Sequence, residues 1–151
     1  MDNETLRRLV QLHEDRNKYF LFSDAAPAVK KAKQLNLKTA IVTTIPDFIF
    51  RSAILSIRDC FDTIMTGYRA GCEKSDPKMH MRTLQSLGVG AQEAAMIGDE
   101  LLVDIKIPKK LGMRTILLDR ANRIKSKPEE ADAKANTLTE AVAIIEKWQK
   151  P

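Results

Sequence analysis

The stretch AAMIGDELLVDIKIPKKLGMRTIL, residues 94–117, decides the fold that we expect for this chain. It opens with the apolar run Ala94–Ile97, which a Gly-Asp-Glu turn interrupts. Helical spacing then extends over Leu101–Leu111, and Gly112 is placed to end that helix. The apolar run Met113–Leu118 suits a buried parallel strand. The stretch therefore predicts a strand, an acidic turn, a helix and a second strand.

Three carboxylates, those of Asp99, Glu100 and Asp104, follow the first strand of this unit. Ligands of open α/β sheets bind at the carboxyl ends of the strands, and crowded carboxylates repel one another unless a cation lies among them. Mg²⁺ binds to one or two carboxylates together with water and phosphate oxygens. We therefore expect a metal site at Asp99. For Glu100 an alternative stays open, which is that it stabilises the positive N-terminus of the following helix.

The rest of the chain alternates between helices and strands. Apolar spacing predicts helices over 5–16, 26–35, 47–57, 77–87 and from 137 to the C-terminus. Short apolar runs predict strands over 38–42, 61–65 and 132–136, and the segments 66–76 and 119–130 are expected loops. Pro108 should bend or shorten the helix that contains it. This alternation predicts an α/β fold with a mainly parallel sheet.

The composition is that of an ordinary water-soluble protein. The 151 residues suggest one domain, with 44% hydrophobic and 30% charged residues. No apolar run approaches the roughly 18 residues that span a membrane, and the N-terminal residues lack the apolar centre of a signal peptide. Cys60 and Cys72 lie far from any CxxC spacing, so we expect reduced thiols and a cytoplasmic protein. The net charge of +5 comes from residues spread along the chain, which favours a solvated basic surface over a nucleic-acid site.

Polar groups at three strand ends suggest one chemistry. Thr43 and Thr44 end one strand, Lys74 lies in the loop after the next, and Asp99 and Asp104 follow a third. Taken singly, such a threonine more often caps a helix and such a lysine is more often solvated. Together, a hydroxyl and an ammonium can hold the oxygens of a phosphoryl group, while carboxylates hold the Mg²⁺ that neutralises its charge.

Three stretches in this order resemble the motifs of the haloacid dehalogenase-like (HAD) hydrolase superfamily. The second motif of the superfamily is an apolar strand that ends in Thr or Ser, like AIVTT at 40–44. The third is a lysine before a helix, like GCEKSDPKMHMRTLQSLGV at 71–89, and the fourth is GDxxxxD, like IGDELLVD at 97–104. The similarity covers about 21–145. It implies a three-layer, Rossmann-like α-β-α fold and Mg²⁺-dependent hydrolysis of a small phosphate ester.

The resemblance also assigns roles to residues of this chain. The roles are phosphate binding for Thr43, Thr44 and Lys74, support of the phosphoryl intermediate and nucleophile for Lys74, and Mg²⁺ binding or its support for Asp99, Asp104 and Glu100. Members of the superfamily begin with a strand that ends in DxD, in which the first Asp is the nucleophile and the second is the general acid/base. This sequence contains no DxD. Asp24 in YFLFSDAA is the nearest candidate for a displaced catalytic nucleophile, but Ala26 takes the place of the second acid.

A different alignment fits the N-terminal region better. The segment LFSDAAPAVKKAKQLNLKTAIVTT, 21–44, resembles the one that follows the helical cap, so 1–18 would be a cap remnant and 19–151 the core domain. The first strand, which lies in the middle of the sheet in this superfamily, would then be absent and would leave its neighbours with unpaired edges. Three hypotheses complete the sheet: Tyr19–Phe22 fills the position, a copy or partner chain donates a strand, or a separate chain carries DxD.

Two functions from different classes follow. The first is a HAD-type phosphatase that forms an aspartyl phosphate on a small phosphorylated substrate once a nucleophile is supplied. The second is a non-catalytic HAD-like module that retains the binding of metal, phosphate or a partner chain. Dehalogenation is a poorer third, because the acidic turn suits phosphoryl chemistry. The substrate stays undefined, since in this superfamily the cap largely selects it.

Overall fold

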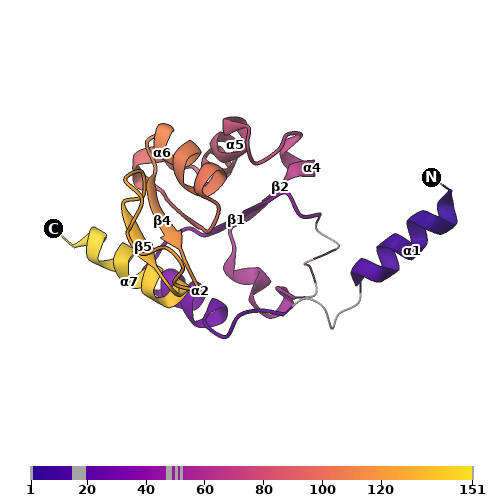
Figure 1. Ribbon diagram of the computed structural model, residues 1–151, viewed down its shortest axis with the longest axis horizontal. Coiled ribbons are helices and arrows are strands. Elements are labelled where there is room, and N and C mark those ends of the chain that lie inside the picture. The colour runs from indigo at the N-terminus through magenta and orange to yellow at the C-terminus, as the bar shows by residue number, and fades with distance from the viewer. Residues whose placement is uncertain (1, 15–19, 47–48, 50, 52, 151) are drawn as a thin grey trace.

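The computed structural model describes residues 2–14, 20–46, 49, 51 and 53–150. Its strands pair in parallel, in a two-stranded sheet β1–β2 and a three-stranded sheet with the order β3–β4–β5 (Figure 1). The strands are β1 (Ala40–Thr43), β2 (Thr63–Thr66), β3 (Ala95–Gly98), β4 (Arg114–Leu118) and β5 (Ala133–Ala135). The helices are α1 (Asn3–Glu14), α2 (Ala25–Gln34), the 3₁₀-helix η1 (Leu55–Cys60), α4 (Gly67–Ala70), α5 (Pro77–Leu87), the 3₁₀-helix η2 (Ala91–Glu93), the π-helix η3 (Leu101–Lys106), α6 (Ile107–Lys110) and α7 (Leu138–Gln149).

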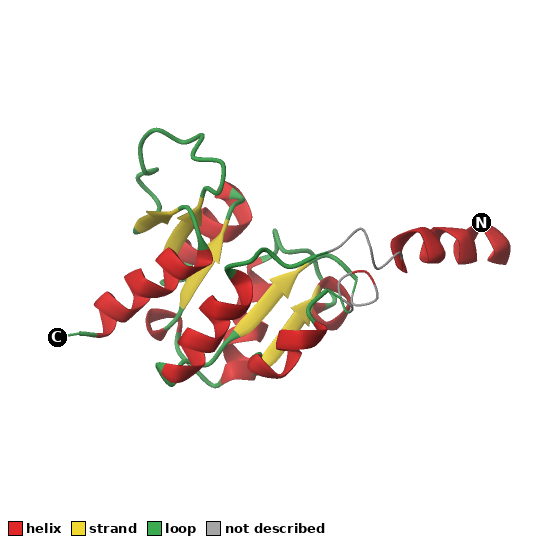
Figure 2. Cartoon of the chain, turned by 90° about the horizontal axis from the view of Figure 1, so that it is seen from below, coloured by secondary structure: helices red, strands yellow, loops and turns green. Residues whose placement is uncertain are grey.

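Helices cover both faces of the strands (Figure 2). Successive side chains of a strand point to opposite faces of its sheet. In β2, Ile64 packs against residues of α2 and η1, whereas Met65 packs against Met79 of α5. In β4, Ile116 packs against residues of α7, whereas Leu117 packs against residues of η3. The architecture is therefore the three-layer α/β fold that the sequence predicts.

Capping residues place ends of the two helices α5 and α7 where the sequence predicts them. Helix α5 has the predicted bounds, Pro77–Leu87, because Asp76 caps its first turn and Gly88 follows its last residue with a φ of 63°. A left-handed residue at this position is usually glycine, since it has no Cβ to clash. Helix α7 begins after Thr137, whose hydroxyl oxygen accepts a hydrogen bond of 3.1 Å from the Glu140 N–H.

The helix predicted over 47–57 is wrong over most of the part that the structure describes. Residues 47, 48, 50 and 52 lie outside the described residues, and Leu55–Cys60 forms the 3₁₀-helix η1. Ile54 and Ile57 are three positions apart and both pack in the core against Ile64. Three residues per turn place them on one side of the helix, so the winding of η1 keeps both side chains in the core.

Two further segments differ from their predictions. The expected loop 66–76 contains α4, which Thr66 caps by accepting a hydrogen bond of 3.3 Å from the Arg69 N–H. The expected helix 101–111 is divided into η3 and α6. Pro108 follows the wide turn of η3 and has no N–H to donate to the carbonyl four residues earlier, so a regular α-helix cannot continue through it.

The strand position that the sequence lacks is not filled by the described part of Tyr19–Phe22. Residues 20–22 form no strand, and Tyr19 lies outside the described residues. Leu21 packs against the core cluster of α2 and η1, whereas Phe20 and Phe22 are exposed. The hypothesis that this segment completes the sheet is therefore wrong for residues 20–22.

Three other sequence predictions bear on the whole chain. Among the helices that the structure describes, none combines the length and the apolar character that crossing a bilayer requires. Cys60 and Cys72 are half-buried thiols without a disulfide. Figure 1 draws α1 apart from the core, and the assignment of 1–18 to a cap remnant stays a prediction.

Candidate active site

Lys74 and Asp104 form an ion pair at the carboxyl ends of the strands. Lys74 Nζ lies 2.6 Å from Asp104 Oδ1, and the side chains are 16% and 1% exposed, respectively. Asp104 Oδ2 accepts a hydrogen bond of 3.1 Å from the Glu100 N–H. These contacts join the loop that follows β2 and α4 to the acidic turn that follows β3. Two residues from separate predicted motifs therefore meet at one site.

The end of β1 reaches the same edge. Thr43 is in register with Thr66 of β2, so these two strands end together. A Cβ placed on Gly67 would lie 3.8 Å from Thr44 Cα, so the turn after β2 lies against the end of β1. Thr43 Oγ1 accepts a hydrogen bond of 3.0 Å from the Ile45 N–H, which leaves the hydroxyl proton for donation to a ligand oxygen.

Gly98 makes room for the buried carboxylate of Asp104. A Cβ on Gly98 would lie 2.2 Å from both Cγ and Oδ2 of Asp104. Packed atoms do not approach so closely, so any side chain at position 98 must displace the carboxylate. This contact gives a physical reason for glycine in the Gly-Asp turn at the end of β3.

We expect Gly98→Ala to lower the free energy of unfolding by about 1–3 kcal/mol, the range for an added group in a packed site. The new methyl group would push Asp104 away from Lys74. Urea unfolding followed by circular dichroism measures the change. Gly90→Ala is the matched control, because a Cβ there meets the ends of two flexible side chains, Glu93 Oε2 at 3.2 Å and Gln92 Oε1 at 3.6 Å. The control should change stability by less than about 0.5 kcal/mol, and equal stabilities of the two variants would contradict the clash.

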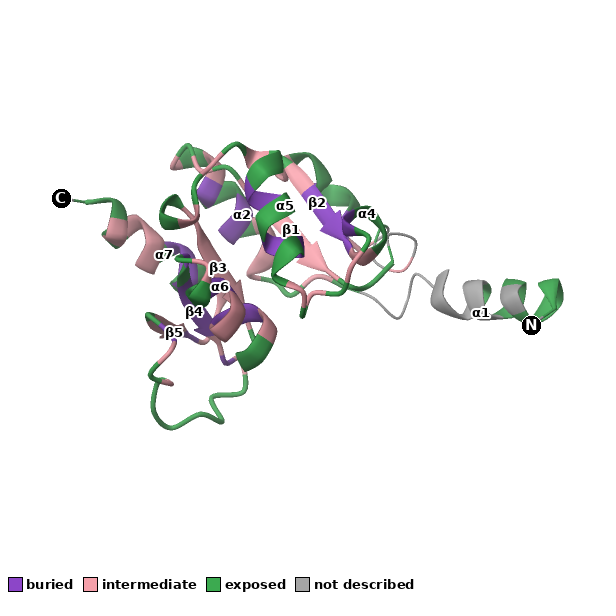
Figure 3. Ribbon diagram, turned by 90° about the horizontal axis from the view of Figure 1, so that it is seen from above, coloured by how far each residue is buried: buried purple, intermediate pink, exposed green. Residues whose placement is uncertain are grey.

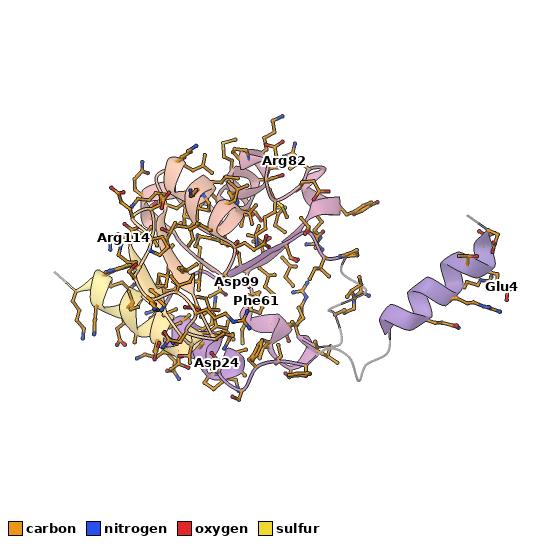
Figure 4. All side chains as sticks on the ribbon, in the orientation of Figure 1. Glu4, Asp24, Phe61, Arg82, Asp99 and Arg114 are labelled. Atoms are coloured by element: carbon orange, nitrogen blue, oxygen red, sulfur yellow. The ribbon has the colours of Figure 1, made fainter. Side chains whose placement is uncertain are left out.

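Asp99 and Glu100 are the exposed acids of the site (Figure 4 labels Asp99). Among the residues that the structure describes, neither carboxylate forms an ion pair, and no group of three or more His, Cys, Asp or Glu side chains gathers as a metal cluster. The Glu100 side chain makes no capping hydrogen bond to η3. The three acids predicted together are thus divided, with Asp104 buried against Lys74 and the other two facing solvent.

His80 is a buried neighbour of the ion pair. Its side chain is 1% exposed, and its Nε2 has no hydrogen-bond partner within the described part of the chain. Burial lowers the pKa of His80, and the charge of Lys74 lowers it further, while Asp104 and backbone carbonyls act in the opposite direction. Burial and the charge of Lys74 thus favour the neutral imidazole. The apolar spacing of α5, with Met79, Thr83 and Leu84 also buried, was the available signal.

Asp24 is held by groups far from it in the sequence. Arg120 Nη1 donates hydrogen bonds of 3.1 and 3.0 Å to its two oxygens, and the Leu138 N–H donates one of 2.6 Å to Oδ2. Burial raises the pKa of Asp24, but the bonds from Arg120 and Leu138 outweigh this effect and hold the pKa below its ordinary value. The Arg120 guanidinium also lies over the Phe22 ring, 4.1 Å from its centroid. The carboxylate thus connects the start of α2 with the start of α7.

The chain is similar to known hydrolases in sequence and in fold. A family model described as haloacid dehalogenase-like hydrolase matches residues 2–112. Phosphoserine phosphatase of Thermus thermophilus is 26% identical over 140 residues, which cover 91% of this chain and 56% of that protein. Ribulose-1,5-bisphosphate 5-phosphatase of Halopiger xanaduensis is 30% identical over 115 residues, with 75% and 45% covered. The crystal structure of a HAD phosphatase from Thermococcus onnurineus has a TM-score of 0.74 and 28% identity, and the match covers 83% of this chain and 58% of that one.

The fold is shared more widely than the sequence. L-2-haloacid dehalogenase from Xanthobacter autotrophicus has a TM-score of 0.76 at 17% identity, with 97% of this chain and 68% of that chain covered. The chain spans about half the length of the curated relatives that it matches, such as 56% and 53% of two of them. Because the family model matches most of the sequence, the chain belongs to the haloacid dehalogenase-like hydrolase family.

Proposed function

We propose that this chain carries the phosphate- and Mg²⁺-binding part of a phosphohydrolase acting on a small phosphate monoester. The nucleophilic carboxylate would come from a segment outside the described residues. The observation that carries the proposal is the ion pair of Lys74 and Asp104 at the strand ends. The phosphatase names of several relatives support the same reaction class.

In this proposal some side chains of the site bind the phosphoryl group and another positions them. The hydroxyls of Thr43 and Thr44 and the ammonium of Lys74 hold phosphoryl oxygens, on which negative charge is concentrated. Asp104 fixes the position of Lys74, because a buried carboxylate 2.6 Å away restrains the flexible lysine side chain. A preorganised cation at this place stabilises a phosphorylated state more than a mobile one does.

Mg²⁺ is the cofactor that this site fits. The exposed carboxylates of Asp99 and Glu100 match its preference for one or two carboxylates with water and phosphate oxygens. These two residues would hold the ion, whereas the charge of Asp104 is already balanced by Lys74. When bound, Mg²⁺ neutralises charge on the phosphoryl group. A cytoplasmic location, which the thiols of Cys60 and Cys72 support, completes the proposal.

The second candidate function is a HAD-like module that binds phosphate and metal without turnover. The contacts of Asp24 support it, because the nearest sequence candidate for a nucleophile is occupied by Arg120 and the Leu138 N–H. Dehalogenation receives less support, since the matched dehalogenase structures share the fold at low identity. The two candidates differ in whether an added nucleophile starts turnover.

The test measures binding and turnover separately. The purified chain is titrated calorimetrically with Mg²⁺ and with inorganic phosphate, and hydrolysis of p-nitrophenyl phosphate is followed in parallel. We expect Asp99→Asn to weaken Mg²⁺ binding and Lys74→Met to weaken phosphate binding, each by about 10–150-fold, because a hydrogen bond or contact with a charged group contributes about 1.5–3 kcal/mol. Asp59→Asn, an exposed acid of η1, is the control and should bind both ions as the wild type does.

Two outcomes would reject the proposal. Binding of both ions that neither Asp99→Asn nor Lys74→Met weakens would show that they bind elsewhere. Turnover by the chain alone that Asp24→Asn abolishes, with the protein still folded, would identify Asp24 as the nucleophile and remove the need for an external carboxylate.

A further inference from the structure

One buried polar side chain beside the candidate site has no part in the proposed function. His80 lies on α5, in which buried residues alternate with exposed ones (Figure 3). Its side chain is 1% exposed. Burial has the largest effect on the pKa of His80, and the charges of Lys74 and Asp104 act on it next, so the ring lies close to the ion pair. A buried polar ring lowers stability unless it makes hydrogen bonds, so its partners matter.

The ring contacts both chain segments that meet in the ion pair. Besides burial and the two charges, hydrogen bonding to the backbones of Val103 and Lys74 acts on the pKa of His80, in the raising direction. Val103 directly precedes Asp104 in the sequence. The Nε2 atom of His80 has no hydrogen-bond partner within the described residues. A neutral imidazole has a single N–H, so the donor to these carbonyls is Nδ1–H.

The Val103 carbonyl needs a donor from outside its own helix. At the end of η3 the Ile107 N–H donates to the Leu102 carbonyl, five residues earlier. The same pattern would pair the Val103 carbonyl with position 108, but Pro108 has no N–H. Backbone carbonyls inside a protein are normally paired. Pro108 therefore leaves one carbonyl of the π-helix open, and His80 supplies the missing donor.

The same helix restrains the backbone of Lys74. The Asp76 N–H donates a hydrogen bond of 2.9 Å to the Glu73 carbonyl, so Lys74 lies in a turn immediately before α5. Asp76 also caps α5, because its Oδ1 accepts a hydrogen bond of 2.9 Å from the Lys78 N–H. The turn is thus fixed to the start of α5, and His80 contacts the Lys74 backbone from the next turn of this helix.

We propose that His80 is a positioning residue of the candidate site, which through its Nδ1–H holds the segment of Asp104 against the turn that carries Lys74. The ammonium of Lys74 then reaches Asp104 Oδ1, at 2.6 Å, from a fixed backbone. Lysine has a flexible four-carbon stem, so both its backbone and its ammonium must be restrained to hold it in one place. The inference rests on the proposed function for phosphate binding by Lys74, but the restraint of the lysine does not require phosphate.

Nuclear magnetic resonance of the purified chain, labelled with ¹⁵N, tests this restraint without phosphate. Long-range ¹H–¹⁵N correlation of the imidazoles shows which nitrogen carries the proton, and His13→Gln identifies the signals of His80, because the chain has two histidines. We expect the proton on Nδ1. The side-chain ammonium signal of Lys74, identified by its loss in Lys74→Arg, should be visible in the wild type. It should broaden beyond detection in His80→Phe, because a released ammonium exchanges its protons with water.

Two substitutions of His80 separate positioning from the filling of space. His80→Phe keeps a ring but has no N–H, whereas His80→Asn is smaller and keeps an N–H donor bonded to Cγ, as Nδ1 is. We expect His80→Phe to weaken binding of inorganic phosphate by about 2–12-fold, the fold-change that corresponds to one net hydrogen bond. His80→Asn should keep the Lys74 signal and bind phosphate within about twofold of the wild type. If His80 only filled space, the larger Phe would preserve the affinity better than Asn.

Two further variants test the reason for the contact. Thr83→Val is the matched control, because it removes another buried donor of α5, whose hydroxyl bonds at 2.8 Å to the Met79 carbonyl of the same helix. It should leave the phosphate affinity and the Lys74 signal unchanged. Pro108→Ala adds an N–H that competes with His80 for the open carbonyl, so it should also weaken phosphate binding. His80→Phe added to Pro108→Ala should weaken binding further by less than about twofold.

Several results would overturn the inference. These are a proton on Nε2 or on both nitrogens of His80, a Lys74 ammonium signal that is absent from the wild type or unchanged in His80→Phe, and equal phosphate affinities of the Phe and Asn variants. A wild-type chain that binds no phosphate rejects the proposed function, and the tautomer and the Lys74 signal then still decide the positioning role. Phosphate binding together with an unchanged Lys74 signal in His80→Phe keeps the proposed function and rejects the positioning role.

Discussion

Replacing Lys74 by methionine is expected to lower the free energy of unfolding by about 3–5 kcal/mol, the range for a buried ion pair that loses one partner. Asp104 would keep its negative charge at 1% exposure without the ammonium that now lies 2.6 Å from Oδ1. The Glu100 N–H would remain as its donor, which does not balance the charge. Asp104→Asn should act in the same direction, because Lys74 would then lack its carboxylate. Either change removes a large part of the about 5–15 kcal/mol that stabilises a typical domain.

The double variant Lys74→Met/Asp104→Asn shows whether the two side chains stabilise the fold through their contact with each other or independently. We expect the double variant to lose about 2–3 kcal/mol less free energy of unfolding than the two single variants lose together, because neither charge is then left buried alone. Urea unfolding of all four proteins gives this coupling energy. Lys33 and Asp62, which are 2.8 Å apart and 36% and 40% exposed, form the matched control pair. The coupling energy of Lys33 and Asp62 should stay within about 1 kcal/mol. Equal coupling energies for the two pairs would contradict the claim that the buried pair of Lys74 and Asp104 is the stronger one.

Local patterns predicted much of the fold and the proximity of two residues of the candidate site. The bounds of α5 follow from Pro77 and Gly88, which act on the backbone within one turn. The motifs that contain Lys74 and Asp104 predicted that both belong to one site, and the structure places them in contact. Each of these features depends on residues adjacent in sequence or on a short pattern with a fixed role.

Local sequence patterns could not predict the contacts between segments that are distant in the sequence. The partners of Asp24 are 96 and 114 residues away, and no periodicity connects such positions. The division of the sheets depends on which backbone edges meet in space, and the apolar run at Tyr19–Phe22 looks like a strand whether or not an edge is available to it. The burial of His80 beside Lys74 and Asp104 likewise depends on contacts between separate segments, which the spacing of α5 alone does not specify.

Replacing Asp24 by asparagine is expected to lower the free energy of unfolding by about 2–3 kcal/mol at pH 7, because hydrogen bonds to a charged group contribute about 1.5–3 kcal/mol each and asparagine keeps only part of them. The carboxylate accepts bonds from Arg120 and from the Leu138 N–H, and its side chain is 14% exposed. Thermal or urea unfolding measures the loss. If Asp24 instead acted as a nucleophile without structural role, the variant would lose turnover and keep its stability.

The pH dependence of this loss identifies the charge as its cause. The folded-state pKa of Asp24 lies below the ordinary value of 3.8, because the bonds from Arg120 and Leu138 outweigh the effect of burial. Between the folded and the unfolded pKa the unfolded chain binds more protons, so the stabilisation by Asp24 is complete above about pH 5 and decreases as the pH falls through the folded pKa. The stabilities of wild type and Asp24→Asn should therefore converge in acid.

Glu146→Gln is the control for this comparison, because Glu146 also connects α2 with α7. Its carboxylate lies 3.2 Å from Lys31 Nζ, but the two side chains are 32% and 45% exposed. Exposed pairs of this kind contribute at most about 1 kcal/mol, and salt screens them. Addition of 0.5 M NaCl should thus reduce the small effect of Glu146→Gln and leave most of the effect of Asp24→Asn. Equal effects of the two substitutions, or equal responses to salt, would mean that the connection from Asp24 to Arg120 and Leu138 is no stronger than a surface ion pair.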